Sequence, residues 1–214
     1  EVGAWSNPLS SDTPTRAAAL LKCKKSLALA DEIGARCCVN IAGSRGEKWD
    51  GPSEDDLTKE TFDIIVETVR DIIDSVNPRN SFYTLETMPW MYPDSADSYA
   101  SLLKAIDRRA CGVHFDPVNL ICSPQRYFNN ASLIKDFIAK LGPNIKSCHA
   151  KDILLDDRLT VHLDEVRPGC GNLDYRTFFD EISNLSQDLP VMLEHLPTED
   201  EYLAAAQFIR GVVR

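Results

Sequence analysis

The sequence predicts an α/β fold in which a parallel sheet curls into an incomplete (β/α)8 TIM barrel. Short apolar segments typical of buried strands alternate with longer amphipathic segments typical of helices along all 214 residues. Such alternation favours parallel strands joined by right-handed crossover helices. In addition, four of the apolar segments end in a carboxylate or an imidazole, and barrel enzymes place their catalytic residues at such strand ends.

The first three strands are each followed by a helix with recognisable start and stop signals. Asp12 or Thr13 can cap the first helix, Pro14 lies in its first turn, and Gly34 ends it. Ser53 is expected to cap the second helix, whose apolar residues recur at helical spacing. We therefore expect strands at 1–6, 36–42 and 82–86, and helices at 13–33, 53–77 and 94–106.

The second half of the chain repeats this pattern with one interruption. Gly142 and Pro143 stop the helix that precedes the fifth strand, and Asp174 can cap the helix that precedes the sixth. A longer excursion, Asp152–Tyr175, separates these last two units. We expect strands at 112–116, 145–149 and 190–194, and helices at 132–141, 175–185 and 199–213.

Two architectures accommodate the alternation, and the polar strand ends favour one of them. A doubly wound sheet binds its ligand at one switch point, usually beside a glycine-rich phosphate turn, and the sequence contains no such turn. A (β/α)8 barrel instead draws its site from several strand ends. The barrel needs eight strands and the pattern supplies six. We therefore expect residues 1–214 to form one barrel domain that lacks two βα units at its N-terminus.

Composition restricts the class of protein. Hydrophobic residues make up 43% of the chain and charged residues 26%, which is typical of a globular domain. No apolar run reaches the length of a membrane span, and the net charge of -10 disfavours a nucleic-acid partner. The seven cysteines include no CxxC pair. A structural zinc site is therefore not expected, and a reducing, cytoplasmic setting fits best.

Four strand-end residues form the candidate site. Glu86, Asp116, His149 and Glu194 lie about one βα unit apart, each at the end of an apolar segment. A charge in such a place is costly without a partner, and equivalent strand ends meet at one end of a barrel. Three carboxylates and one imidazole suit a divalent cation. We expect one such ion, Mn²⁺ first, with Mg²⁺, Co²⁺ and Zn²⁺ as alternatives.

Each of these four residues also has a purely structural explanation. Glu86 and Glu194 can form interior salt bridges, for which Lys151 is the one basic residue at a matching strand end. Asp116 can cap a turn, since a proline follows it directly. His149 can be a core histidine whose ring nitrogens are satisfied by neighbours. The strength of the metal hypothesis lies in the equivalent position of all four residues.

Three neighbouring residues are expected to have structural roles. His195 directly follows Glu194, so strand alternation should point its side chain to the opposite face of the sheet. Lys151 and Asp152 are adjacent at the end of the fifth strand. We expect them to form an ion pair that holds the following loop.

The ligand pattern resembles the xylose isomerase-like TIM-barrel superfamily, and within it the sugar-phosphate isomerase/epimerase group related to ketose 3-epimerases. The four site residues fall on the metal-ligand positions of that family. The segment Arg167–Tyr175, which reads RPGCGNLDY, is similar to the family's segment after the histidine strand. The resemblance covers essentially the whole chain. It also implies a homo-oligomer, either a dimer or a tetramer.

The resemblance implies a chemistry as well. A divalent ion bound to adjacent carbonyl and hydroxyl oxygens of a sugar acidifies the neighbouring C–H, and carboxylates on opposite faces can remove and return the proton. The family assigns these acid/base roles to Glu86 and Glu194. The expected reaction passes through an enediolate, and it is an epimerisation or an aldose–ketose isomerisation of a sugar or sugar phosphate.

Six further residues are candidates for substrate binding. Asn119 stands where the well-known 3-epimerases have a substrate-contacting histidine, and Arg167 matches a substrate-contacting arginine of the family. His114 shares the strand face of Asp116 by alternation. The remaining aromatic and amide candidates near strand ends are Trp5, Trp90 and Asn40.

Three other functions remain open beside the metal-dependent isomerase or epimerase. A polyol dehydratase of the same superfamily would use the same metal but expel a hydroxyl group. An abasic-site endonuclease binds several zinc ions and needs more histidines than the four in this chain. It also needs a basic surface for DNA, which the net charge of -10 opposes. The last alternative is a non-catalytic sugar-binding barrel or an inactive fragment.

Overall fold

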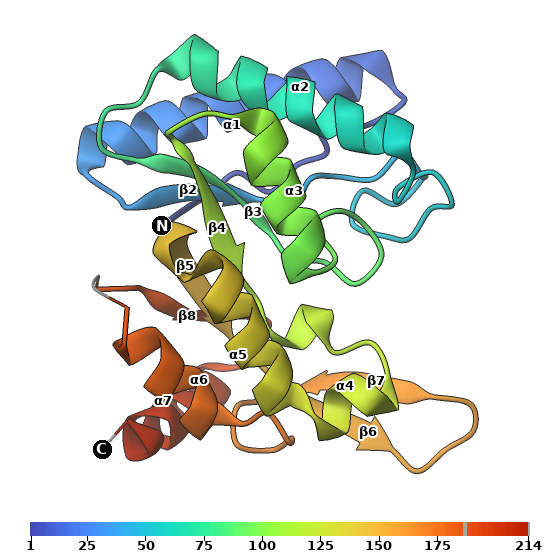
Figure 1. The fold of residues 1–214 in the computed structure, drawn as a ribbon, viewed down its shortest axis with the longest axis vertical. Helices are drawn as coiled ribbons and strands as arrows, with labels where there is room; N and C mark the ends of the chain where they lie inside the picture. The colour runs from blue at the N-terminus through green and yellow to red at the C-terminus, as the bar shows by residue number, and fades with distance from the viewer. Residues whose placement is uncertain (186–187, 214) are drawn as a thin grey trace.

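The computed structural model describes residues 1–185 and 188–213. Six parallel strands form one curved sheet in the order β1, β2, β3, β4, β5 and β8, with helices on its outer side (Figure 1). The incomplete (β/α)8 barrel predicted from the sequence is therefore confirmed. The strands of the sheet are β1 (Val2–Gly3), β2 (Cys37–Asn40), β3 (Phe82–Glu86), β4 (Cys111–Phe115), β5 (Ile145–Ala150) and β8 (Val191–Leu193).

A helix follows each strand of the sheet before the next strand begins. Two short 3-10 turns, η1 (Val118–Leu120) and η2 (Gly142–Asn144), complete the connections around β4 and β5. Neighbouring helices lie side by side along the curve of the sheet (Figure 1). The helices are α1 (Thr13–Ile33), α2 (Lys59–Val76), α3 (Ala96–Ile106), α4 (Pro124–Phe128), α5 (Asn130–Leu141), α6 (Tyr175–Ser183) and α7 (Glu199–Val212).

One large apolar core lies between the sheet and its helices. Tyr83, Val113 and Cys148 of the central strands are buried in the same cluster as Leu102 and Phe137 of the helices. Helix α2 shows how the sequence achieves this, because its buried residues recur at three- and four-residue spacing and give it one apolar face. The packed core fixes the strands relative to one another, and so it also fixes the side chains at their ends.

The strand register brings the C-terminal ends of the strands to one side of the barrel. Glu86 of β3 lies opposite His114 of β4, which in turn lies opposite Ser147 of β5. His149 of β5 lies opposite Met192 of β8. β1 and β8 are the two edge strands of the sheet. The ends of β3, β4, β5 and β8 are thus neighbours in space.

The second helix begins later than the sequence predicts. Ser53 was the expected cap, but helix α2 starts at Lys59, and the Thr58 side chain accepts a hydrogen bond from the Thr61 N–H. The reason lies in Asp56, which is fully buried. Its carboxylate accepts hydrogen bonds from Ser44 and Arg45 at 2.6 and 2.8 Å. These bonds keep the preceding residues in a loop and delay the helix.

The excursion after β5 contains an antiparallel hairpin, which the sequence patterns did not predict. Strands β6 (Asp152–Asp156) and β7 (His162–Val166) pair with each other rather than with the main sheet. The hairpin projects away from the barrel (Figure 1). The excursion therefore adds a separate small sheet between the fifth and the last strand of the barrel.

Asp152 anchors this excursion through the backbone. Its carboxylate is buried and accepts four backbone N–H groups at 2.9–3.1 Å, from Ile153, Gly169, Gly171 and Leu173. A side chain at Gly171 would overlap the Asp152 carboxylate, so the clamp requires glycine there. The predicted ion pair between Lys151 and Asp152 is wrong, because Asp152 binds backbone amides and Lys151 pairs with other carboxylates.

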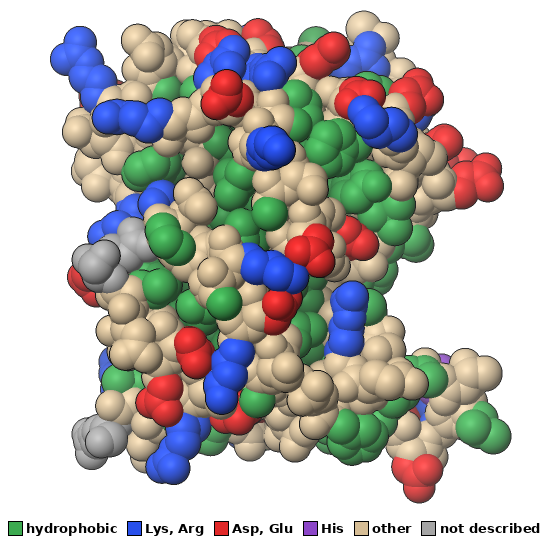
Figure 2. All heavy atoms as spheres, viewed as in Figure 1, with side chains coloured by type: hydrophobic (Ala, Val, Ile, Leu, Met, Phe, Trp, Pro, Cys, Tyr) green, Lys and Arg blue, Asp and Glu red, His purple; other side chains and the backbone are tan. Residues whose placement is uncertain are grey.

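The surface carries both signs of charge. Figure 2 shows Lys and Arg side chains interspersed with Asp and Glu over the helices of this face, with apolar side chains between them. Within the described ranges, no helix combines the length and the apolar character that crossing a membrane requires.

Candidate metal centre

The four predicted ligands come together at the C-terminal ends of their strands. Glu86 is the last residue of β3, His149 lies within β5, and Asp116 and Glu194 directly follow β4 and β8. One donor atom from each residue lies within 4.8 Å of the other three. Glu86, Asp116 and His149 are buried, whereas Glu194 is partly exposed. The structure therefore brings together the four residues that the strand-end pattern singled out.

His149 lies in the middle of the carboxylates. Its Nδ1 atom is 2.7 Å from Glu194 Oε1, 3.1 Å from Glu86 Oε1 and 3.6 Å from Asp116 Oδ2. Burial lowers the pKa of His149, but the surrounding carboxylates raise it further, so that the pKa lies above the ordinary value for imidazole. The ring thus carries positive charge in the presence of these carboxylates alone.

Asp116 divides its two oxygens between fold and site. Oδ1 accepts the N–H groups of Val118 and Asn119 at 2.9 and 3.2 Å, which caps the turn after β4. Oδ2 faces His149 instead. Burial raises the pKa of Asp116, but Lys151 and His149 together lower it below its ordinary value, and the carboxyl is ionised. The turn-cap explanation and the ligand hypothesis therefore each describe one oxygen of the same side chain.

Lys151 belongs to this cluster, as the basic strand-end residue expected in any interior salt bridge of Glu86 and Glu194. Its Nζ atom lies 2.8 Å from Asp116 Oδ2 and 3.4 Å from Glu86 Oε1, and it also contacts Glu194 Oε1. Burial lowers the pKa of Lys151, but these carboxylates raise it above its ordinary value. Strand alternation was the available signal, because Lys151 lies two residues after His149. The ammonium touches the same oxygens that would hold a metal ion.

The donor set fits a divalent cation. Asp116 Oδ2 and Glu194 Oε1 are buried without a well-oriented hydrogen bond, although the Lys151 ammonium lies close to both. An ammonium needs directed N–H bonds, whereas a metal ion binds oxygens without that requirement. Three carboxylate oxygens and one imidazole nitrogen form a hard donor set suited to Mg²⁺ or Mn²⁺, with Zn²⁺ also accommodated. Glu86, Asp116, His149 and Glu194 would hold such an ion.

A cavity of about 520 Å³ adjoins the cluster. This volume suits a small organic ligand. The cavity walls combine aromatic and apolar side chains with Glu86, Glu194 and Lys151 of the cluster. Among the sequence-predicted substrate residues, those that line it are Trp5, Trp90 and Asn119.

Asn119 reaches the site through Glu86. Its Nδ2 atom donates a hydrogen bond to Glu86 Oε1 at 3.0 Å. This bond orients the carboxylate and leaves the amide at the cavity wall. A contact between Asn119 and a substrate stays a prediction. Trp90 is fixed in the wall by a hydrogen bond from its indole N–H to the Asp50 carbonyl at 3.0 Å.

The other three predicted substrate residues lie away from the cavity wall. His114 is fully buried behind His149, with Nδ1 2.6 Å from the Ser147 hydroxyl. Arg167 pairs with Glu201 of α7 at 2.7 Å. The buried amide of Asn40 donates hydrogen bonds to the Ser6 carbonyl and the Cys23 sulfur, and it accepts one from the Ser6 N–H. These side chains contribute to the packing around the site.

His195 corrects the expectation drawn from strand alternation. Strand β8 ends at Leu193, and His195 adopts a left-handed backbone with φ of 57°. Its ring therefore lines the cavity instead of pointing to the opposite face. Nδ1 lies 3.0 Å from Glu165 Oε1 of β7, and this contact raises the pKa of His195. The hairpin thus supplies Glu165 to the wall of the cavity.

The fold and the strand-end cluster together define a TIM-barrel protein of the xylose isomerase-like class. A family model described as xylose isomerase-like TIM barrel matches residues 3–212, so the chain belongs to that family. A comparison with curated proteins gave no match.

Solved structures of proteins with different activities share the fold. A xylose isomerase-like TIM barrel protein from Mycobacterium smegmatis, in complex with magnesium, is 17% identical with a TM-score of 0.70, and the match covers 95% of this chain and 70% of that one. L-ribulose 3-epimerase is 14% identical with a TM-score of 0.68, over 97% and 71%. The probable 3-DHS dehydratase AsbF from Bacillus anthracis is 17% identical with a TM-score of 0.72, over 99% and 75%. At these identities the likeness concerns the fold alone.

Proposed function

We propose that the protein is a divalent-metal-dependent isomerase or epimerase of a sugar or sugar phosphate, with Glu86 and Glu194 as its acid/base pair. The observation that carries the proposal is the cluster of three carboxylates and one imidazole beside the cavity. A divalent ion bound there would polarise the carbonyl of a sugar and acidify the adjacent C–H. The chain belongs to the xylose isomerase-like family, and sugar epimerases are among the solved structures that share its fold. Both findings support the same class of reaction.

The two glutamates approach the cavity from different strands. Glu86 ends β3 and Glu194 follows β8, at the far edge of the sheet. Each contributes an oxygen close to His149 and is also part of the cavity wall. Burial raises the pKa of Glu194, but His149 and Lys151 lower it to about 2, so that its carboxylate is ionised at neutral pH.

Proton removal from the carbon beside a sugar carbonyl gives an enediolate. The carboxylate that takes the proton and the carboxylic acid that returns one must lie on different faces of the sugar for epimerisation. Return of a proton to the neighbouring carbon gives isomerisation instead. The indole rings of Trp5 and Trp90 offer apolar walls for the C–H faces of a sugar. Asn119 offers an amide to a hydroxyl group.

The test combines metal binding with proton exchange. Metal content is measured by mass spectrometry on protein purified without chelator, followed by titration with Mn²⁺. Ketoses and their phosphates are then incubated in deuterated water, and incorporation of deuterium at the carbon beside the carbonyl is followed by NMR. We expect one ion per chain and metal-dependent exchange. We also expect Glu86→Gln and Glu194→Gln to lower exchange by a factor of about 10² to 10⁴, which is the usual contribution of a general acid or base.

Glu67→Gln is the matched control, because Glu67 is an exposed carboxylate of helix α2. It should leave metal binding and exchange unchanged. A product that has lost a hydroxyl group, in place of a deuterated sugar, would identify the dehydratase alternative. A wild-type protein that binds no divalent ion after reconstitution with Mn²⁺ would refute the enzyme hypothesis and leave a non-catalytic sugar-binding barrel.

A further inference from the structure

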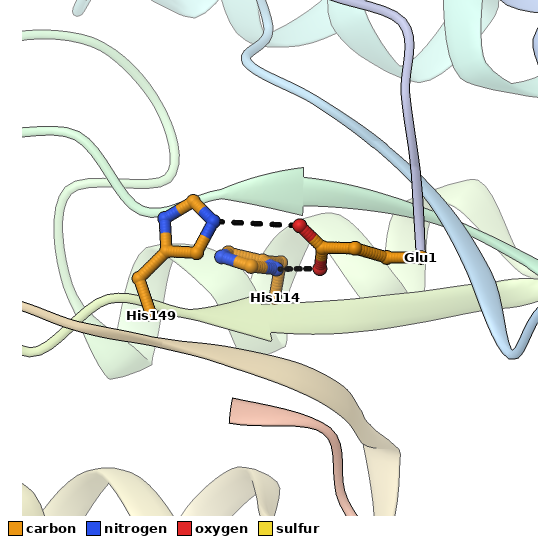
Figure 3. Close-up of side chains that lie close together, drawn as sticks. All are labelled: Glu1, His114 and His149. Atoms are coloured by element: carbon orange, nitrogen blue, oxygen red, sulfur yellow. Dashed lines mark ion pairs between the residues drawn. The ribbon is translucent and has the colours of Figure 1, made fainter. Parts of the chain in front are cut away.

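His149 uses its two ring nitrogens on opposite sides. Nδ1 faces the carboxylates of the candidate metal centre, at 2.7 Å from Glu194 and 3.1 Å from Glu86. Nε2 faces the other way, into the barrel, where it lies 3.5 Å from Glu1 Oε1 (Figure 3). Glu1 is outside the set of four ligands and outside the cavity wall.

Glu1 is held deep in the barrel. It precedes β1, and only 10% of its side chain is exposed. Its second oxygen, Oε2, lies 3.5 Å from His114 Nδ1 and is buried without a hydrogen bond. Figure 3 shows the carboxylate facing both imidazole rings, with one oxygen toward each. A buried carboxylate in such a position needs a positively polarised partner.

His114 supports the ring of His149 from the side. The two ring centroids are 4.0 Å apart with an interplanar angle of 70°, which is an edge-to-face contact. His114 is in turn fixed by the Ser147 hydroxyl at 2.6 Å from Nδ1. The plane of the His149 ring is therefore set by His114, and the direction of its Nε2 atom is set by Glu1.

We propose that Glu1 is a positioning residue of the metal centre. The Glu1 carboxylate accepts the Nε2–H of His149, and this contact directs the Nδ1 lone pair of the same ring toward the metal ion. This inference rests on the proposed function. A neutral imidazole has one N–H and one lone pair. Ligation through Nδ1 therefore requires the proton on Nε2, and that N–H requires an acceptor. Glu1 supplies the acceptor, as carboxylates do for many metal-bound histidines.

The same chemistry argues against a second metal ion between Glu1, His114 and His149. Those three residues do offer donor atoms within 4.8 Å of one another. However, His149 would have to lose both ring protons to bind one ion through each nitrogen. With Nδ1 assigned to the strand-end cluster, Nε2 is a donor, and Glu1 acts as its acceptor.

The first test is the affinity for Mn²⁺, measured by electron paramagnetic resonance and calorimetry. Glu1→Ala removes the acceptor and should weaken binding about 10- to 100-fold, the usual effect of removing such a partner. Glu1→Gln keeps an acceptor oxygen and should recover most of the affinity. Glu67→Ala, which removes an exposed carboxylate of α2, should bind as the wild type does. Wild-type affinity in Glu1→Ala would overturn the proposal.

The second test reads the ring directly. In the Zn²⁺-loaded wild type, ¹⁵N NMR of His149 should show the proton on Nε2, with a strongly downfield proton resonance. This resonance should move upfield in Glu1→Gln and broaden or vanish in Glu1→Ala. If Glu1→Ala does not fold, the isosteric Glu1→Gln decides, and an unmoved resonance overturns the proposal.

Two further outcomes separate the proposal from its alternatives. A second equivalent of metal in the wild type that Glu1→Ala loses would make Glu1 a ligand and overturn its positioning role. A wild type that binds no metal would defeat the proposed function alone. In that case the Nε2–H resonance of His149 is measured in the metal-free protein. A downfield resonance that Glu1→Ala removes supports the contact with Glu1, and a resonance that is unchanged in Glu1→Ala overturns it.

Discussion

Replacement of Lys151 by methionine tests the electrostatics of the candidate metal centre. The Lys151 ammonium contacts oxygens of Asp116, Glu86 and Glu194, all of which belong to the candidate ligand set. A divalent ion must therefore displace this tethered cation before it can bind. Lys151→Met removes the competitor while it keeps a side chain of similar length and volume in a site where lysine is only 2% exposed.

Two opposite effects are expected from this one change. Without metal, loss of one partner of a buried ion pair leaves carboxylates unpaired and should cost about 3–5 kcal/mol of unfolding free energy. With metal, the ion no longer competes with the ammonium, so the same free energy favours binding. At about 1.4 kcal/mol per factor of ten, the affinity for Mn²⁺ should rise by roughly 100- to 4,000-fold.

The assay is urea denaturation with and without Mn²⁺, together with calorimetric titration. Lys151→Met should unfold at lower urea than the wild type in the presence of chelator and gain more stability from Mn²⁺. Lys25→Met is the control, because Lys25 is an exposed residue of α1. The reasoning is refuted if Lys151→Met binds Mn²⁺ no more tightly than the wild type, since the ammonium would then not share the site with the ion.

Three other predictions follow from the structure. Asp152→Asn replaces one carboxylate oxygen by an NH₂ group, so that two of the four backbone N–H groups face a donor instead of an acceptor. At about 1.5–3 kcal/mol for each lost hydrogen bond, the free energy of unfolding should fall by roughly 3–6 kcal/mol. Urea unfolding and faster amide exchange in the loop measure this loss, and a change under 1 kcal/mol would contradict it. Burial raises the pKa of Glu194, but His149 and Lys151 lower it from 4.5 to about 2. The ionised carboxylate should therefore contribute roughly 3 kcal/mol to metal-free stability above pH 4.5, and this contribution should disappear as the pH falls toward 2. The check is the unfolding free energy measured against pH, which should depend less on pH in Glu194→Gln than in the wild type. Iodoacetamide should label the exposed Cys122 and Cys170 of the native protein first, since burial raises the pKa of other thiols; mass spectrometry that finds a buried cysteine modified as quickly would disprove it.

The clustering of the four candidate ligands could be predicted because its signal is local. Each carboxylate or imidazole ends an apolar segment, and parallel strand ends in a barrel meet on one side. The strand alternation that points His149 toward the site also points Lys151 there, because Lys151 lies two residues later. Lys151 was the candidate partner for salt bridges of Glu86 and Glu194, but its contact with Asp116 was not predicted, because the adjacent Asp152 offered a simpler partner in the sequence.

The remaining features depend on contacts that no local pattern encodes. Glu1 reaches His149 across the barrel, and its residue type alone does not indicate that direction. His195 leaves the strand alternation because its backbone is left-handed. The hairpin that carries Glu165 is fixed by bonds from one carboxylate to distant amides, and such bonds have no periodicity that a sequence pattern can reveal.

The last βα unit is weakly attached to the sheet, and it carries one of the four candidate ligands. Strand β8 pairs through three residues at the edge of the sheet, and helix α7 buries only Ala205 completely among its described residues. Few buried contacts mean a low free energy of local opening. An ion held jointly by Glu86, Asp116, His149 and Glu194 would bind the interior strands to this edge. Release of the ion and undocking of the C-terminal unit would then be a single event, so the occupancy of the site would set how long the barrel keeps its last segment.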